Sequence, residues 1–247
     1  MKNEIIKIDK LSRVFRVGSE DVHALKHVSF SIYEGEFVSI MGTSGSGKST
    51  LLNILGCLDT PTSGEYSIDG VKISTRSKSE LSKMRNTKIG FVFQNYNLLA
   101  RTTAIDNVML PLLYNNKIPA KEKRDRAIEA LKAVGLESRM NHMPNQLSGG
   151  QQQRVAIARA LVNDPVILLA DEATGNLDTR TSYEIMTLFQ DLHSQGKTIA
   201  FVTHEPDISA FTDRIILLRD GHIIKDTEVT PISAKEALEK LPPPEVD

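Results

Sequence analysis

Tryptophan is absent from this chain of 247 residues, cysteine occurs once, and the net charge is −1. A single cysteine excludes an intrachain disulfide, and Cys57 lies in an apolar run where we expect a small buried residue rather than a reactive thiol. The 30 basic and 31 acidic residues almost cancel, so no global electrostatic field favours nucleic acid or anionic lipid as a partner. These features fit a reducing, cytoplasmic setting.

Long hydrophobic runs are also missing. No stretch approaches the roughly 18 apolar residues of a membrane-spanning helix, and the longest runs, such as residues 166–170, have the length of a strand. The first residues lack the apolar segment of a secretory signal peptide, so we expect none. If the protein acts at a membrane, another chain must hold it there. The 40% hydrophobic content suffices for one full core with a smaller subdomain.

The chain does contain an alternation of strand-like and helix-like patterns. Period-two alternation and short apolar runs predict strands at residues 5–15, 28–32, 37–41, 89–93, 166–171, 198–202, 215–218 and 223–225. Helical patterns predict helices at residues 48–58, 103–134, 150–162 and 181–193. Strands that alternate with helices indicate an α/β fold with a mainly parallel sheet that is covered on both faces.

A glycine-rich loop follows the predicted strand at residues 37–41 and precedes a helix. Its residues match the phosphate-binding loop pattern in full: Gly42, Thr43, Ser44, Gly45, Ser46, Gly47, Lys48, Ser49 and Thr50. The glycines let successive backbone N–H groups point inward at an anion, which the positive end of the following helix also faces. In this pattern Lys48 contacts the β- and γ-phosphates of ATP, and Ser49 offers its hydroxyl to Mg²⁺. A flexible turn would not explain the lysine–serine pair at this offset.

Two carboxylates emerge at the end of the predicted buried strand at residues 166–171. Ligands of open α/β sheets bind at the carboxyl ends of the strands. Asp171 is therefore predicted to support Mg²⁺ through water, and Glu172 is predicted to be the base that activates or orients the attacking water. Two acids after a strand can also simply cap the next helix, but the phosphate-binding loop upstream favours the catalytic interpretation.

A second anion site is indicated by a serine–glycine segment that opens a helix. Its residues, which provide a hydroxyl and accessible backbone N–H groups, are Ser148, Gly149, Gly150 and Gln151. With the preceding Leu147, this segment resembles the signature motif of the ATP-binding-cassette ATPases. The resemblance implies a head-to-tail dimer, in which the motif of one subunit closes on the γ-phosphate held by the other. In isolation the pattern could be an ordinary N-cap, but its place before Asp171 favours the family interpretation.

Further residues match the same family in order along the chain. The resemblance implies that Gln94 reaches Mg²⁺ or the water and that His204 contacts the γ-phosphate. It also implies that Asp178 belongs to a loop that crosses between subunits and that Phe15 stacks on adenine, although an aromatic residue at a strand end often just packs. The expected catalytic residues are thus Glu172, His204, Gln94 and Lys48, and the expected metal-binding residues are Ser49, Gln94 and Asp171.

The resemblance covers residues 5–225 and implies the domain organisation of a phosphate-loop ATPase. We expect a single cassette domain whose core, at residues 1–94 and 163–230, includes an N-terminal antiparallel β subdomain. A helical subdomain at residues 95–162 carries the signature and is inserted into this core. Residues 231–247 form a C-terminal tail.

Finer detail is similar to the macrolide-exporter and lipoprotein-release ATPases. The matching segments are residues 52–64, 93–99 and 174–178. The family usually has proline at the position of Ala173. Alanine restores a backbone N–H there and loosens the backbone beside Glu172. We expect hydrolysis to survive this departure.

The resemblance also implies the partners. They are a second copy of the chain and an integral-membrane permease with a large extracytoplasmic domain, which would hold the protein at the cytoplasmic face of the inner or plasma membrane. One alternative is a cell-division-type ATPase that signals through a permease without transport. Another is a soluble cassette ATPase that acts on DNA or the ribosome, but the chain has no sustained heptad run and only one cassette. We therefore expect no nucleic-acid partner. The residues do not identify a cargo.

Overall fold

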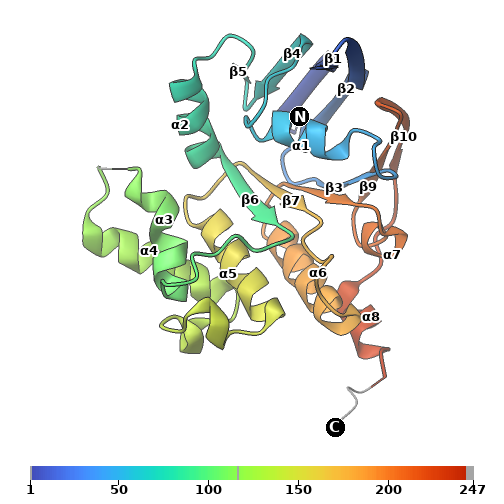
Figure 1. Cartoon of the computed structure of the whole chain (residues 1–247). Coiled ribbons are helices and arrows are strands. Elements are labelled where there is room, and N and C mark those ends of the chain that lie inside the picture. Colours follow the sequence, from blue (N-terminus) through green and yellow to red (C-terminus); the bar gives the residue numbers. More distant parts are fainter. Residues whose placement is uncertain (1, 116, 243–247) are drawn as a thin grey trace.

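The larger of two β-sheets forms the centre of the molecule (Figure 1). The computed structural model describes residues 2–115 and 117–242. In these residues the larger sheet has the order β10-β9-β3-β8-β7-β6, and its neighbours are parallel except for the antiparallel pair of β9 and β10. Its strands are β3 (Phe37–Met41), β6 (Ile89–Phe93), β7 (Ile167–Asp171), β8 (Ile199–Thr203), β9 (Arg214–Arg219) and β10 (His222–Glu228). The carboxyl ends of β3, β7 and β8 therefore meet at one edge.

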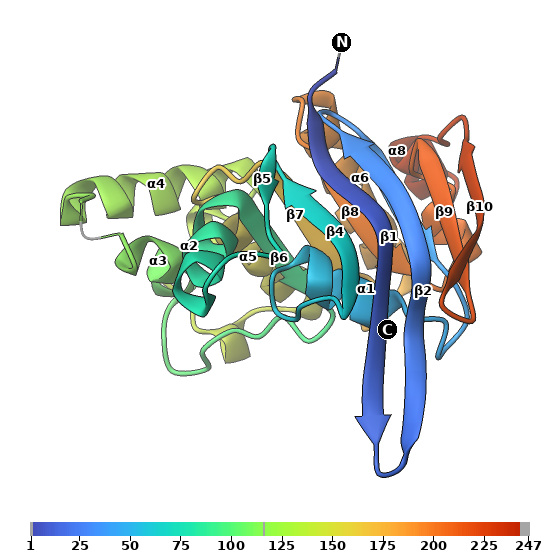
Figure 2. The same cartoon turned by 90° about the horizontal axis from the view of Figure 1, so that it is seen from above.

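The smaller sheet is antiparallel and has the order β2-β1-β4-β5. Its strands are β1 (Glu4–Val17), β2 (Glu20–Tyr33), β4 (Ser63–Ile68) and β5 (Val71–Lys72). The two long strands β1 and β2 form a hairpin whose tip projects well beyond the rest of the sheet (Figure 2). The predicted α/β fold, with a mainly parallel core sheet, an N-terminal antiparallel sheet and a helical insertion, is confirmed.

The helices cover the larger sheet and build the helical part of the molecule. They are α1 (Lys48–Leu55), α2 (Lys78–Lys88), α3 (Ala104–Leu113), α4 (Ala120–Ala133), α5 (Gly149–Leu161), α6 (Thr179–Ser194), α7 (Pro206–Ser209) and α8 (Ala234–Glu239). Two short 3₁₀-helices, Glu137–Arg139 and Pro144–Gln146, connect α4 to α5. Helices α3 and α4 lie beyond the β6 edge of the sheet, on the side away from β10 (Figure 1). No helix in residues 2–115 and 117–242 is long and apolar enough to cross a membrane.

Alternation along the central strands divides the core into two layers. On β7, Leu168 and Ala170 belong to the cluster that packs against α3, α4, α5 and α6. The intervening Ile167 and Leu169 belong to the cluster that packs against α1 and the smaller sheet. Both faces of the strand are buried, which explains its continuous apolar sequence.

Several element boundaries differ from those predicted. The helical pattern at residues 103–134 is divided into α3 and α4, and Pro119, which restricts the backbone of the residue before it, is the N-cap of α4. Helix α1 ends earlier than predicted, at Leu55, because the chain turns at Gly56 and takes a left-handed conformation at Cys57 (φ 55°). Helices α2, α7 and α8 and strands β4 and β5 were not predicted. Residues 243–247 of the predicted tail lie outside the described residues.

Candidate functional site

The glycine-rich loop wraps around the ammonium group of Lys48. This side chain is only 8% exposed, and its Nζ donates hydrogen bonds to the backbone oxygens of Gly42 (2.7 Å) and Thr43 (3.0 Å). No carboxylate lies among these partners, so a positive charge is held inside the loop by carbonyl dipoles. The arrangement places a fixed cation at the start of α1, where the helix dipole is also positive. Such a site favours an anion with several charges.

Two glycines make the narrow loop possible. Gly47 is the N-cap of α1 at φ 104°, and a Cβ atom there would lie 2.5 Å from the backbone oxygen of Ala24. Gly42 also has a positive φ, 157°, and a Cβ atom there would collide with Leu218 O and Ser46 Oγ. The Oγ of Ser46 is buried and has no hydrogen-bond partner in the described residues. A tight cradle with an unpaired hydroxyl and no side-chain cap fits a phosphate chain as its occupant.

A pocket of about 860 Å³ opens over this loop. All residues of the predicted phosphate loop except Ser46 line it, and Glu172 and His204 line it from the ends of β7 and β8. Residues 22–24 of β2 form another wall. The volume lies within the range of small-ligand and cofactor sites. Residues that are far apart in the sequence thus converge on the carboxyl edge of the larger sheet, as predicted.

Glu172 and His204 are in direct contact in this pocket. His204 Nδ1 lies 2.9 Å from Glu172 Oε1, and because an ionised carboxylate only accepts hydrogen bonds, the ring nitrogen is the donor. Glu172 has a left-handed backbone (φ 44°), which is uncommon for a residue with a side chain, and its N–H donates to Val202 O at 2.9 Å. The adjacent Ala173 is buried, as expected for a residue under this turn. The dyad places an acceptor and a titratable group side by side over the phosphate loop.

Asp171, the last residue of β7, lies in a different electrostatic environment. Burial raises the pKa of its carboxyl group, and the neighbouring charge of Glu172 raises it further, whereas the ammonium group of Lys48 opposes both effects. A carboxylate whose charged form is disfavoured gains more than an exposed one from a bound cation. Asp171 is therefore well suited to hold a metal ion directly or through water.

The predicted metal-binding residues fit Mg²⁺ by their chemistry. Ser49, Gln94 and Asp171 offer hydroxyl, amide and carboxylate oxygens, and Mg²⁺ prefers few protein oxygens together with water and phosphate. No group of three or more His, Cys, Asp or Glu side chains in the described part of the chain could hold a metal ion without other ligands. A metal ion here would therefore need phosphate or water oxygens to complete its shell.

Gln94 is held by a residue that the sequence analysis did not single out for a side-chain role. Its Nε2 donates to Asn176 Oδ1 (3.2 Å), and Asn176 Nδ2 donates back to Gln94 O (3.2 Å) and to Asn95 Oδ1 (2.9 Å). This reciprocal pair joins the segment after β6 to the segment after Glu172. The sequence signal that could have revealed it is an amide residue two positions before Asp178.

Gln153 is a second functional candidate missed by the sequence analysis. It is fully buried on α5, its Nε2 donates to Ala173 O at 2.7 Å, and its Oε1 has no partner in the described residues. Arg159, one and a half turns further along α5, donates to Tyr96 O (2.7 Å) and Asn97 O (2.6 Å). Tyr96 and Asn97 both have left-handed backbones. Helix α5 is therefore bonded both to the segment that follows β6 and to Ala173, the residue after Glu172. A long polar side chain on the apolar face of a helix was the available signal.

The serine–glycine segment begins α5 as a helix cap. Ser148 Oγ accepts from the N–H of Gln151 (3.3 Å), and Gln151 Oε1 accepts from the N–H of Ser148 (3.1 Å). A Cβ atom on Gly149 would come within 2.9 Å of the Tyr96 hydroxyl, and one on Gly150 within 2.5 Å of Thr181. None of Ser148 to Gln151 lines the pocket over the phosphate loop. The structure thus brings Lys48, Glu172 and His204 together but leaves Ser148 apart from them.

The two remaining predicted residues, Phe15 and Asp178, do not line the pocket over the phosphate loop. Phe15 is 36% exposed on the β1–β2 hairpin and does not line the pocket itself, although its cross-strand partner Val22 does. Cross-strand partners share a face of the sheet, so the ring lies at the rim of the pocket. Asp178 caps α6, because its carboxylate accepts from the N–H of Thr181 (2.9 Å) and from its hydroxyl. Hydrogen bonds from Thr181 lower the pKa of Asp178.

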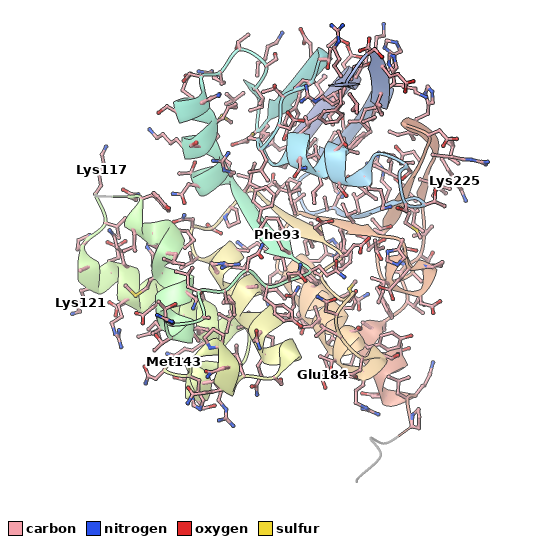
Figure 3. All side chains as sticks on the ribbon, in the orientation of Figure 1. Phe93, Lys117, Lys121, Met143, Glu184 and Lys225 are labelled. Carbon is pink, nitrogen blue, oxygen red and sulfur yellow. The ribbon has the colours of Figure 1, made fainter. Side chains whose placement is uncertain are left out.

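A second cavity, of about 1090 Å³, lies between α2, the β6 edge and the end of α3. Its charged lining residues are all cationic: Lys83, Arg85, Lys117 and Arg159. Its apolar lining includes the stacked rings of Phe91 and Phe93, 5.3 Å apart, and Tyr114, which is 82% exposed. Figure 3 shows Lys117 and Phe93 on opposite sides of this region, and Lys225 on the far side of the molecule. We name this surface the basic groove.

Comparisons with known proteins agree with this geometry. A family model described as "ABC transporter" matches residues 25–175. The uncharacterized ABC transporter ATP-binding protein YvrO of Bacillus subtilis is 51% identical over 222 residues, which are 90% of this chain and 96% of that protein. The macrolide export ATP-binding/permease protein MacB of Chlorobaculum tepidum is 52% identical over 90% of this chain, which spans 34% of that protein. A solved structure of the ATP-binding cassette MJ0796 shows a dimer in a post-hydrolysis state bound to ADP and Pi. It superimposes on this chain with a TM-score of 0.83 at 49% identity, and the match covers 92% of this chain and all of that one.

Proposed function

We propose, on the premise that this chain belongs to the ABC transporter family, that it forms a head-to-tail homodimer around two ATP·Mg²⁺. In this proposal the dimer drives a membrane permease of the macrolide-exporter and lipoprotein-release type. The chain is an ABC-type ATPase and the ATP-binding subunit of a transporter. The permease would hold it at the cytoplasmic face of the membrane. The similarity to MacB, which combines both functions in one protein, supports this partner.

One observation supports the proposed homodimer. Each chain has a phosphate loop with a buried lysine, and it also has a second helix start without an acidic residue, at Ser148, that does not line the same pocket. A chain with one nucleotide has no phosphate for the second site. Two chains in antiparallel arrangement satisfy both sites, because each Ser148 then completes the pocket of the other. The dimeric structure of MJ0796 supports this arrangement.

The residues of the pocket have distinct proposed roles. Lys48 and the backbone N–H groups of the loop bind and orient the β- and γ-phosphates. Glu172 accepts a proton from, or orients, the attacking water, and His204 holds the carboxylate of Glu172 and reaches the γ-phosphate. Ser49, Asp171 and Gln94 would hold Mg²⁺, which when bound neutralises charge that develops on the phosphate oxygens.

A Glu172→Gln variant separates binding from turnover. The amide keeps the shape of the side chain but cannot act as a base, so we expect ATP to convert the variant from monomer to dimer while hydrolysis falls by at least about 100-fold. Light scattering after size-exclusion chromatography measures the mass, and phosphate release measures turnover. Wild-type turnover in this variant would remove Glu172 from its role. A strictly monomeric variant at high ATP and protein concentration would contradict the dimer.

A mixing experiment tests the head-to-tail geometry. Lys48→Ala removes the phosphate cation of its own pocket, and Ser148→Asp keeps a helix cap but places a negative charge towards the partner's phosphate. Each variant alone should be inactive. In a mixed dimer one pocket takes Lys48 from one chain and Ser148 from the other, so ATPase activity should reappear on mixing. Ser233→Asp, the same change at the cap of α8, serves as the control and should retain activity. An inactive mixture would contradict the geometry.

We further propose the basic groove as the surface that binds the permease. It lies between the core and the helical segment 95–162, so a partner bound there contacts both. Its four cations, the exposed Tyr114 and the partly buried rings of Phe91 and Phe93 complement an amphipathic segment that carries acidic residues. Helix α5 borders the groove through Arg159 and begins at Ser148, so movement of the helical segment on dimerisation would reach the partner.

Site-specific photo-crosslinking tests this partner. A photoreactive phenylalanine analogue at Tyr114, in the native host, should crosslink to one integral-membrane protein with a large extracytoplasmic domain. The same analogue at the exposed Ile224 of β10 is the control and should not. Lys117→Glu should weaken the crosslink at Tyr114, whereas the exposed Lys225→Glu should not. Crosslinks from Tyr114 to soluble proteins or nucleic acid alone would contradict a permease partner.

A further inference from the structure

Phe15 carries a cation on one face of its ring. The guanidinium carbon of Arg13 lies 4.4 Å from the centroid of the Phe15 ring, which is cation–π contact distance. The two residues are two positions apart on β1 and so share a face of the strand. Because Arg13 covers one face of the ring, a planar ligand can stack only on the other face.

Arg13 is itself held in place by Asp59, a residue outside the β1–β2 hairpin. Its Nη2 donates to Asp59 Oδ1 (2.9 Å), and its Nε lies 2.8 Å from Asp59 Oδ2. Both side chains are about three-quarters buried, with exposed fractions of 22% and 26%, so this ion pair is less screened by solvent than a surface pair. The Arg13 guanidinium therefore cannot swing freely away from the ring.

Asp59 connects this contact to the phosphate loop. It lies just beyond α1, and its N–H donates to the backbone oxygen of Asn53 within that helix (3.1 Å). The same loop is bonded to β1 again, because Thr62 Oγ1 accepts from the N–H of Val14 (3.0 Å) and the N–H of Thr62 donates to Ser12 O (2.8 Å). A continuous series of contacts thus runs from the helix that follows the phosphate loop, through Asp59 and Arg13, to Phe15.

We propose that Arg13, anchored by Asp59, is a positioning residue for the purine of the nucleotide. It fixes the plane of the Phe15 ring at a set position relative to α1, so that base stacking and phosphate binding are satisfied together. It touches neither phosphate nor reacting atoms. The inference rests on the proposed nucleotide site and on the expectation that Phe15 stacks on adenine.

Nucleotide affinity separates this role from a structural one. Arg13→Ala should weaken ATP binding by about fivefold, the range of a partly desolvated cation–π contact, and raise KM without changing kcat. Affinity for inorganic tripolyphosphate, which has no base, should not change. Arg13→Lys, which keeps a cation over the ring, should recover most of the affinity. As a control, Lys72→Ala removes an exposed ion pair with Glu65 on the same sheet and should change the affinity for neither ligand.

The charge-reversed double variant, Arg13→Asp with Asp59→Arg, adds a second test. It restores an ion pair between hairpin and loop but places a carboxylate beside the ring. We expect it to recover the Tm that Arg13→Ala loses and to keep the weak ATP affinity. Recovery of both would overturn the positioning role, as would equal losses for ATP and tripolyphosphate in Arg13→Ala.

Phe15→Ala separates the role of Arg13 from the role of Phe15. It should weaken ATP binding by about tenfold or more, as for loss of a base-stacking ring, without affecting tripolyphosphate. If Phe15→Ala has this effect and Arg13→Ala has none, the role of Arg13 is wrong while the nucleotide site stands. If Phe15→Ala also leaves ATP affinity unchanged, the base-stacking role of Phe15 fails, and the inference fails with it.

Discussion

The N-termini of α1 and α5 differ from those of the other α-helices in residues 2–115 and 117–242. The other helices each have an acidic side chain at the cap or in the first turn: Glu80 in α2, Asp106 in α3, Glu122 in α4, Asp178 in α6, Asp207 in α7 and Glu236 in α8. Helices α1 and α5 have none. The chain thus neutralises most of its helix dipoles with its own carboxylates.

The contrast is sharpest between α2 and α5. Both begin with a serine in a capping box, but the reciprocal partner is Glu80 in α2 and Gln151 in α5. An amide completes the hydrogen bonds of the cap without cancelling the positive end of the helix. At α1 and α5 that field remains available to an anion from outside the chain. The two helix starts proposed to bind phosphate are therefore also the two that carry no neutralising carboxylate of their own.

Adding an acid to α1 should have the largest effect. Ser49→Asp places a carboxylate in the first turn, where it stabilises the helix by about 0.5 kcal/mol but repels a triphosphate. Relative to the isosteric Ser49→Asn, we expect ATP affinity to fall by about 100-fold, since like charges a few ångströms apart cost several kcal/mol. Calorimetric titration measures the affinity, and thermal unfolding should show no loss of stability. Equal affinities in the two variants would mean that the helix start is not open to phosphate.

Making α5 resemble α2 should have the next largest effect. Gln151→Glu retains the acceptor for the N–H of Ser148 and adds a charge. We expect the ATP affinity of the monomer to stay unchanged, and ATP-dependent dimerisation and kcat to fall by about tenfold, the range of a partly buried helix-dipole effect. Gln195→Glu adds the same charge beyond α6 and should leave kcat unchanged. Full activity of Gln151→Glu would argue against a phosphate at Ser148.

For α6, which has an acidic N-cap, a substitution at the cap should change the stability of the protein. Asp178→Ala removes the cap of α6 and should lower the free energy of unfolding by about 1 kcal/mol in the absence of nucleotide. Asp178→Asn keeps a good capping oxygen and should recover most of that loss. Urea unfolding measures both. If the asparagine variant were as unstable as the alanine variant, the charge rather than the hydrogen bond would be what α6 requires.

The smallest effect is expected for Glu80→Gln, which gives α2 the cap of α5. Hydrogen bonds from the backbone N–H and the hydroxyl of Ser77, followed by one from Arg76, lower the pKa of Glu80 from 4.5 to about 2. A lowered carboxyl pKa contributes stability above pH 4.5 that is lost as the pH falls towards 2. The Tm difference between wild type and variant should therefore be constant near neutral pH and shrink below pH 4.5. ATPase activity should not change. A pH-independent difference would contradict the role of the charge.

The position of the candidate site at one edge of the sheet was easier to predict than the helices. The phosphate loop, Glu172 and His204 each follow a buried apolar strand, and Asp171 ends one. The carboxyl ends of parallel strands meet at one edge, so the convergence of these residues followed from the pattern. Helix α2 was missed because only Leu81 among its residues is buried, which leaves no apolar period to detect. Helix α8 is short, and its residues also gave no signal.

Contacts that depend on side-chain direction could not be predicted. The left-handed backbone of Glu172 and its hydrogen bond to His204 follow from how β7 and β8 end in space, not from local preference. The same holds for Gln153, whose partner Ala173 O is a backbone atom 20 residues away. Arg13 reads as an ordinary surface cation until Asp59, 46 residues away, is placed beside it. In each case the deciding partner belongs to another element.

The two hydrogen bonds of Arg159 would let α5 tilt about the end that carries this residue. They fasten one end of α5 to the carbonyl groups of Tyr96 and Asn97, while Ser148 stands at the other end. Thirteen residues of helix span about 20 Å, so a tilt of about 10° at the fastened end would move the far end by roughly 3 Å, about one hydrogen-bond length. If the proposed permease moves this helix, a small displacement would thus suffice to engage or release the phosphate proposed at Ser148. Such coupling would link ATP hydrolysis to movement of the proposed permease through the single guanidinium group of Arg159.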